Sequence, residues 1–237
     1  MSNVLKKIIS ILPNAIAIRL RHFASLIRLI NNKRSYFIMQ HVNALYKHNI
    51  YFKSWIDSWE VNATVLNGEC TPWMNYAIVQ FLIDRVPANI NIFEYGSGYS
   101  TIFWSKRCKS VHSVENDEEW FGKISRELKN YTNIHLTFQD LSKNGCNYVN
   151  AIDKGIKFDI VVIDGRHRVK CCKEVIHHLT DNGVIILDNS QREYYLEGIE
   201  FLKSKDFKEL RFHHIAPLTY ENECTSIYYR KNNIFNI

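Results

Sequence analysis

A short apolar strand followed at once by two closely spaced glycines starts a regular pattern at residue 91. The pattern predicts a buried strand over 91–95, a tight glycine bend over 96–98 and a helix over 100–107. Further apolar strands alternate with helical stretches, and they are expected at 110–115, 133–137, 158–164 and 183–188. Such alternation predicts a parallel sheet with helices on both faces, which binds its ligand beyond the carboxyl ends of the strands.

The glycine bend is typical of a place where backbone contacts a ligand. Gly96 and Gly98 allow a tight turn and a close approach, and the helix that follows offers free N–H groups. Glu94 and Thr101 depart from the dinucleotide-binding fingerprint, which usually has an apolar residue and a third glycine at these positions. Glu115 ends the second strand, where an acid needs a partner and is placed to accept hydrogen bonds from two ribose hydroxyls.

At these residues the chain resembles the class I S-adenosylmethionine-dependent methyltransferases. The resemblance rests on F-E-Y-G-S-G at 93–98, S-V-E at 113–115, Q-D at 139–140, F-D-I-V-V-I-D-G at 158–165 and G-V-I-I-L-D-N at 183–189. The chain is also similar to a bacterial group with E-Y-G-S-G-x-S-T, I-D-G-R-x-R and L-D-N-S-x-R, often associated with surface-glycan gene sets. The resemblance implies an α/β fold with a Rossmann-like, doubly wound, seven-stranded and mostly parallel sheet. Its C-terminal antiparallel hairpin is expected from 207–213 and 225–230.

The resemblance also implies S-adenosyl-L-methionine as the cofactor. The glycine bend would lie under its methionine portion, Glu94 would face its amino group, and Glu115 would bind the ribose. Gln139 or Asp140 would lie near the adenine amino group, and Trp120 is a candidate either for an adenine face or for core packing. The expected cofactor contacts are Glu94, Gly96, Ser97, Gly98, Ser100, Thr101, Glu115, Asn116, Gln139, Asp140 and Asp164.

The methyl acceptor is expected beside the segments that follow the fourth and fifth strands. Methyl transfer from a sulfonium aligns nucleophile, methyl group and sulfur, excludes water and in some cases removes a proton. Asp164 and His167 are the catalytic candidates, because an imidazole with a pKa of about 6.5 suits proton removal at neutral pH. A packed or solvated side chain is the alternative interpretation of His167.

Asp164, Asp188 and Asn189 form an all-oxygen set at two adjacent strand ends, and Mg²⁺ takes such ligands. The set is similar to the metal site of catechol-type O-methyltransferases, where the ion lowers the pKa of a bound hydroxyl and orients it. Those relatives carry further acids where this chain has Arg166 and Arg168. Two arginines oppose a cation and suit an anionic acceptor or a carboxylate-bearing sugar, so a metal site and a metal-free site both stay open.

The excess positive charge is confined to the start of the chain. Residues 1–56 contain nine Lys and Arg and no acid, whereas the remainder contains 21 basic and 24 acidic residues. A nucleic-acid-binding protein would be basic more uniformly, so no nucleic-acid partner is expected. Apolar steps of four and three over 16–30 predict an amphipathic helix, flanked by helices over 4–12 and 35–46. We therefore expect a basic helical extension over 1–56 and a methyltransferase-like Rossmann domain over 57–237.

Several roles for this extension can be compared. Its longest uncharged run, 8–18, is far shorter than the ~20 residues of a membrane-spanning helix. A secretory signal fits poorly, because Pro13-Asn14 interrupts the apolar run and arginines follow it. Two roles stay open: residues 1–31 contact an anionic membrane at the inner face, or the helices form a cap that packs on the domain or on a second subunit of a homodimer. The six cysteines form no C-x-x-C pair, which favours reduced thiols in a cytoplasmic protein.

The sequence thus predicts a cytoplasmic enzyme that methylates oxygen on a glycan or small-molecule acceptor with S-adenosyl-L-methionine. One alternative is an NAD(P)-dependent oxidoreductase. The other is a protein without catalysis, either a cofactor-binding protein or a scaffold at the membrane surface.

Overall fold

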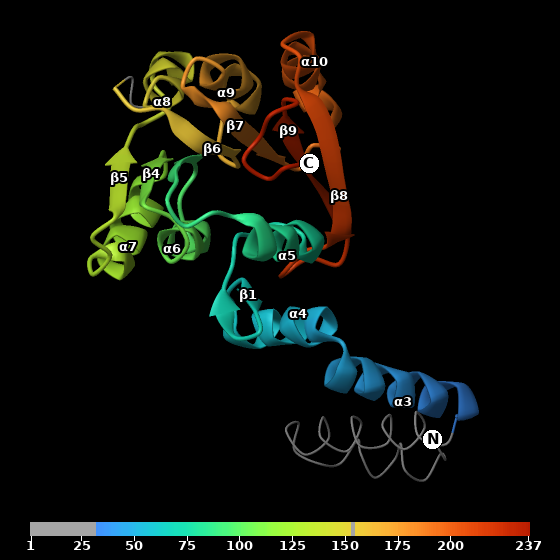
Figure 1. Ribbon diagram of the computed structural model, residues 1–237. Helices are drawn as coiled ribbons and strands as arrows, with labels where there is room; N and C mark the ends of the chain where they lie inside the picture. Colours follow the sequence, from blue (N-terminus) through green and yellow to red (C-terminus); the bar gives the residue numbers. More distant parts are fainter. Residues whose placement is uncertain (1–31, 153–154) are drawn as a thin grey trace. The chain divides into compact units, whose positions relative to one another are not determined.

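The computed structural model describes residues 32–152 and 155–237 (Figure 1). The chain divides into two compact units, Met1–Lys53 and Ser54–Ile237. Helix α4 (Ile50–Val61) continues across this division. The helices expected over 4–12 and 16–30 lie outside the described residues, and the domain boundary at 56/57 stays a prediction.

The first unit contains helix α3 (Lys33–His48), which is longer at both ends than the predicted 35–46. Asn32 caps its start, because the Asn32 side chain accepts a hydrogen bond of 3.0 Å from the Arg34 N–H. Asn49 then separates α3 from α4 and accepts hydrogen bonds of 3.0 and 2.9 Å from the N–H groups of Tyr51 and Phe52. No α3 residue is buried.

The second unit is built on one seven-stranded sheet with the strand order β5-β4-β3-β6-β7-β9-β8. The strands are β3 (Asn91–Tyr95), β4 (Ser110–Glu115), β5 (Ile134–Phe138), β6 (Phe158–Ile163), β7 (Leu179–Asp188), β8 (Lys208–Ile215) and β9 (Asn222–Tyr229). Strands β3 to β7 are parallel, while β8 and β9 form an antiparallel hairpin that joins the sheet through β9 and β7. The predicted α/β fold with a doubly wound, mostly parallel sheet is therefore confirmed.

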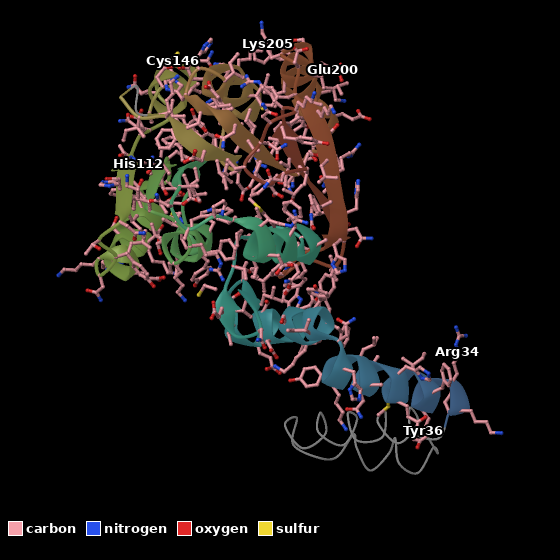
Figure 2. The ribbon with its side chains drawn as sticks, in the orientation of Figure 1. Arg34, Tyr36, His112, Cys146, Glu200 and Lys205 are labelled. Carbon is pink, nitrogen blue, oxygen red and sulfur yellow. The ribbon has the colours of Figure 1, made fainter. Side chains whose placement is uncertain are left out.

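Helices cover both faces of this sheet (Figure 1). One face carries α5 (Tyr76–Arg85), α6 (Tyr99–Ser105) and α7 (Glu118–Leu128), and the other carries α8 (Cys146–Val149), α9 (Arg168–Val175) and α10 (Leu196–Ser204). Single turns η1 (Lys143–Gly145) and η2 (Glu193–Tyr195) precede α8 and α10, and a small hairpin of β1 (Val65–Leu66) and β2 (Glu69–Cys70) precedes α5. In Figure 2 the side chains of Glu200 and Lys205 project from the outer end of the α10 region, away from the strands.

The alternation of side chains along β3 divides the core from the site. Phe93 and Tyr95 are buried in the main hydrophobic cluster together with Tyr148 of α8. Neighbouring residues of a strand point to opposite faces, so Glu94 lies on the other face, where α6 packs. The strand thus buries its apolar face and turns one carboxylate towards the helix that follows the glycine bend.

Strand β7 begins at Leu179, four residues before the predicted start at 183. Leu179 pairs with Phe158, and the register of the two strands shifts before Ile160. A β-carbon on Gly183 would lie 3.0 Å from the Phe158 carbonyl oxygen, so the glycine allows this close approach. Apolar periodicity did not reveal residues 179–182 of β7, because the pairing with β6 is irregular over this part of the strand.

Within residues 32–152 and 155–237, no helix combines the length and the apolar character needed to cross a bilayer. All six cysteines carry free thiols.

Candidate cofactor and acceptor site

A cavity of about 640 Å³ opens at the carboxyl ends of β3, β4 and β6, within the unit Ser54–Ile237. Strand β3 pairs with β4 on one side and with β6 on the other, so the cavity lies at the switch point of the sheet. The chemically informative part of its wall is Gly96, Ser97, Gly98, Tyr99, Ser100, Glu115, Asn116, Asp117, Trp120, Lys123, Asp164, Gly165, Arg166 and Arg168. The rest of the wall is Asn62, Ala63, Thr64, Trp73 and Leu218.

The glycine bend forms the floor of this cavity. Gly96 has a φ of +95°, and a β-carbon on it would lie 3.4 Å from the Cα atom of Gly165. This left-handed backbone conformation and the close approach to the end of β6 both favour glycine. On the opposite side, the Trp120 indole N–H donates a hydrogen bond of 2.8 Å to the Ser97 carbonyl. The bend is therefore fixed between α7 and the end of β6.

Glu94 lies beneath the bend and is not part of the cavity wall. The Glu94 carboxylate accepts hydrogen bonds from Ser113 (2.7 Å), Ser100 (2.9 Å) and Thr101, and the residue is 1% exposed. Thr101 in turn accepts a hydrogen bond of 3.0 Å from the N–H of Gly98. The threonine at the position of the third fingerprint glycine therefore connects the bend to a buried acid. Burial raises the pKa of Glu94 to about 7.

Glu115 is held at the cavity wall by four hydrogen bonds. One carboxylate oxygen accepts from the N–H groups of Asn116 (2.7 Å) and Asp117 (2.9 Å). The other accepts from the N–H (3.1 Å) and the hydroxyl (3.0 Å) of Ser97. Of these four donors only the Ser97 hydroxyl can rotate away, because the three N–H donors are fixed by the backbone. The glycine bend and the acid that ends β4 therefore converge on one place.

The other expected cofactor residues divide into two groups. Asn116 lines the cavity beside Glu115, as expected for a ligand contact. Gln139 and Asp140 follow β5 and do not belong to the wall. The N–H of Gln139 donates to the Glu115 carbonyl (2.9 Å), and Asp140 accepts from the N–H of Ser142 (3.0 Å). The structure thus brings Glu115 and the bend together and leaves the expected adenine contacts outside the cavity.

The three residues of the expected metal site are close together, but around a guanidinium. Arg168 donates to the Asp164 carboxylate (2.8 Å), the Asp188 carbonyl (2.6 Å) and the Asn189 side-chain oxygen (3.3 Å). The Asp188 carboxyl also accepts a hydrogen bond of 2.5 Å from the Thr225 hydroxyl. Mg²⁺ needs free oxygens at about 2.1 Å in an octahedron, and a positive charge already lies among these oxygens. The residues present do not fit Mg²⁺, and this part of the sequence prediction has no support.

Asp164 and Asp188 form a coupled carboxyl pair beside Arg168. Burial and the neighbouring Asp164 raise the pKa of Asp188 to about 8. Asp164 also has a raised pKa through burial, and this effect is opposed by the charge and hydrogen bond of Arg168. The pKa of both carboxyl groups is thus raised above the ordinary aspartate value, chiefly through burial. Asp164 is the member of the pair that lines the cavity, and its carboxylate oxygen lies 2.8 Å from the Arg168 guanidinium.

His167 lies outside the cavity wall. It has a φ of +51° at the start of α9, and a β-carbon on Gly145 would overlap its imidazole ring. The ring thus packs on the turn before α8, while the neighbouring Arg166 and Arg168 line the cavity. The geometry gives no support to His167 as a proton acceptor.

Sequence reasoning missed several residues that shape the site. Thr225 reaches Asp188 from the antiparallel hairpin, and Leu218 lines the cavity from the loop between the two hairpin strands. Tyr148 fills the space beside Gly165, where a β-carbon would overlap its hydroxyl. No local motif marks these three residues. For Arg168, in the G-R-H-R segment, the sequence did offer a signal. It follows Asp164 by four residues across a strand–helix turn, a spacing that allows the two side chains to form an ion pair.

Comparisons with known proteins agree with this geometry. Residues 93–190 match a family model described as a methyltransferase domain. The search among curated proteins gave no match. A methyltransferase from Pyrococcus furiosus is 19% identical, with a TM-score of 0.50 over 75% of this chain and 97% of that one. A precorrin-6y C5,15-methyltransferase from Geobacter metallireducens is 17% identical, with a TM-score of 0.50 over 65% of this chain and 87% of that one.

The sheet order, with its terminal hairpin and its cavity at the switch point, defines a Rossmann-like methyltransferase fold. The match to the methyltransferase-domain model covers residues 93–190, which include the glycine bend, β4 and the end of β7, and it agrees with the resemblance to the class I S-adenosylmethionine-dependent methyltransferases. The resemblance predicted from the sequence motifs is confirmed.

Proposed function

We propose that the cavity binds S-adenosyl-L-methionine and that the enzyme transfers its methyl group to an oxygen of a glycan or small-molecule acceptor. The observation that carries this proposal is the convergence of Glu115 and the glycine bend in one cavity of about 640 Å³. That volume lies within the range of small-molecule sites.

Different residues of the cavity wall would bind different parts of the cofactor. Glu115 binds the ribose hydroxyls after the Ser97 hydroxyl rotates, and the bend carries the methionine portion over Gly96. Trp120 offers an aromatic face towards the adenine, and its own N–H is already used by the Ser97 carbonyl. The bound sulfonium supplies an electrophilic methyl group, and the protein's part is to align it and to exclude water.

The acceptor would approach from the side of Asp164 and Arg166. Asp164 lines the cavity directly after β6, and Arg168 holds its carboxylate by a 2.8 Å ion pair. An acceptor hydroxyl next to Asp164 can pass its proton to this carboxylate as the methyl group transfers. Arg166 is exposed and offers its guanidinium to an anionic group of the acceptor.

The nicotinamide alternative receives no support from the site. In the dinucleotide-binding fold the doubly wound sheet has the order 3-2-1-4-5-6 and a third glycine packs the helix against the strand. Here an antiparallel hairpin ends the sheet, and Thr101 uses its hydroxyl to join Gly98 to Glu94.

We also propose that the basic extension brings the enzyme to an anionic membrane surface at the inner face. Helix α3 supports this, because it contains no acid and several of its apolar side chains, such as Phe37 (59%) and Ile38 (50%), are exposed. The further residues of the expected arm, 1–31, lie outside the described part of the chain.

Calorimetry with S-adenosylhomocysteine tests the cofactor assignment. The wild-type chain should bind it, and Glu115→Ala should weaken binding by more than about tenfold, the scale of a lost charged hydrogen bond. Glu118→Ala removes an exposed acid of α7 outside the cavity and should leave the affinity unchanged. Binding that is equal in the wild type and Glu115→Ala, with both folded by circular dichroism, would refute the ribose assignment. Tighter binding of NADH would favour the oxidoreductase.

A screen of nucleotide sugars, lipid-linked glycans and small hydroxylated metabolites tests the acceptor side. Once an acceptor is found, Asp164→Asn should lower kcat while the affinity for S-adenosylhomocysteine stays within about twofold. Unchanged turnover in Asp164→Asn would show that the carboxylate takes no part in the transfer. Absence of turnover with every acceptor, despite cofactor binding, would favour a non-catalytic scaffold.

A further inference from the structure

The guanidinium of Arg168 uses every one of its five N–H donors. Its Nε donates to the Gly165 carbonyl (3.0 Å), and one terminal nitrogen donates to the Asp188 carbonyl (2.6 Å) and the Asn189 side chain (3.3 Å). The other terminal nitrogen donates to the carbonyl and the carboxylate of Asp164, both at 2.8 Å. All five acceptors belong to the ends of β6 and β7 or to the residues directly after them. The guanidinium therefore ties the two strand ends together.

This position is unusual for a cation, because Arg168 is the first residue of α9 and only 8% exposed. The start of a helix carries a partial positive charge and disfavours another one nearby. A buried guanidinium also loses its hydration. Both costs are offset by the Asp164 carboxylate and by four neutral oxygens directed at the same group.

We propose that Arg168 takes the place of a divalent metal ion at the acceptor side, so that methyl transfer by this enzyme is independent of metal. The three oxygens expected to bind Mg²⁺ stand at the same two strand ends. Two of them, on Asp164 and Asn189, accept directly from Arg168. The third residue, Asp188, offers its carbonyl to Arg168, while its carboxyl accepts from Thr225. A protein cation with fixed geometry thus fills a set of oxygens that otherwise suits a metal.

Arg168 acts as a positioning residue in this arrangement. It orients the Asp164 side chain at the cavity wall through the 2.8 Å ion pair, and it links the end of β6 to the end of β7 without a bound ion. This inference rests on the proposed function of the cavity, and it concerns the acceptor side alone. Cofactor binding and the occupancy of the oxygen set by a cation can therefore be measured separately.

Electron paramagnetic resonance of Mn²⁺ added to the full chain tests the proposal. The wild type should show no Mn²⁺ signal that depends on Asp164. An EDTA concentration of about 100-fold over the protein should leave the affinity for S-adenosylhomocysteine within about twofold. A wild-type Mn²⁺ site that Asp164→Asn abolishes would overturn the proposal. If the wild type shows no Mn²⁺ site and also fails to bind S-adenosylhomocysteine, the result would instead contradict the proposed function.

Replacement of the guanidinium supplies the complementary test. Arg168→Met removes the charge at similar length, and it should create one Mn²⁺ site that raises the melting temperature of the variant. Lys173→Met removes an exposed cation of the same helix and should bind no Mn²⁺. A folded Arg168→Met variant that gains no Mn²⁺ site would show that these oxygens do not form a cation site. If the variant does not fold, the wild-type and Asp164→Asn measurements decide.

Discussion

At the scale of single residues, the site depends on hydrogen bonds that are already formed in the protein. The four donors to Glu115 fix its carboxylate before any ligand binds, and three of them are backbone N–H groups. Preformed contacts reduce the ordering cost of binding. The same carboxylate holds Ser97 of the bend, so Glu115 shapes the floor of the cavity and is the residue that the proposed function assigns to the ribose.

Gly96→Ala should weaken both folding and binding. Its φ of +95° disfavours a β-carbon by about 1–2 kcal/mol, and that carbon would also approach Gly165. Gly68 is the matched control, because its φ is +80° and a β-carbon there would meet nothing within 4 Å. Urea unfolding should therefore show both variants destabilised, while calorimetry shows weaker S-adenosylhomocysteine binding only for Gly96→Ala. Equal affinity in the two variants would mean that the bend does not carry the ligand.

Glu94→Gln should change how stability depends on pH. Burial raises the pKa of Glu94 from 4.5 to about 7, so the folded state binds a proton that the unfolded state has lost in this range. The free energy of unfolding should therefore fall as pH rises from about 4.5 to 7, and Glu94→Gln should remove roughly 1–3 kcal/mol of this fall. Urea unfolding at a series of pH values measures it. A wild-type slope retained in the variant would contradict the role of Glu94.

Glu209 supplies a control of the opposite sign. Despite partial burial, hydrogen bonds from Ser226 and Tyr228 and the charge of Lys203 lower its pKa. Its contribution to stability is therefore present above 4.5 and lost as pH falls through the lowered folded-state pKa. Glu209→Gln should leave the slope between about 4.5 and 7 as it is in the wild type.

At the scale of elements, local patterns identified the strands well because each parallel strand is a short apolar run bounded by turn residues. The expected range 91–95 equals β3, and 110–115 equals β4. The site was predicted where it depends on neighbours in the chain, as at the glycine bend and Glu115. It was missed where the partner comes from a distant element, as with Thr225 and Asp188. His167 shows the same limit, because the turn around Gly145 that receives its ring has no signature in the sequence.

Charge reversal in α3 tests the membrane proposal at the level of one helix. The full chain should co-sediment with vesicles that contain anionic phospholipid and not with neutral vesicles. Combined Lys33→Glu, Arg34→Glu and Lys47→Glu should reduce co-sedimentation by more than about tenfold, since each basic residue near such a surface contributes about 1 kcal/mol. The control carries the same charge change on the other unit, at Lys203, Lys205 and Lys208. Equal co-sedimentation of both triple variants would favour a helical cap.

At the scale of the whole molecule, the sheet brings residues from distant parts of the chain to one edge. The bend after β3, the acid at the end of β4, and Asp164 after β6 meet there because parallel strands end on the same side. Methyl donor and acceptor would then be held side by side, with Arg168 joining the acceptor-side strand ends. The fold thus places both halves of the proposed methyl-transfer site at one edge of the sheet.

A crystal structure with S-adenosylhomocysteine tests the central claim most directly. The account predicts both ribose hydroxyls within about 3 Å of the Glu115 carboxylate, the Ser97 hydroxyl rotated away, and the homocysteine portion over the glycine bend. Ligand density elsewhere on the protein, or a ligand in the cavity with its ribose away from Glu115, would contradict it.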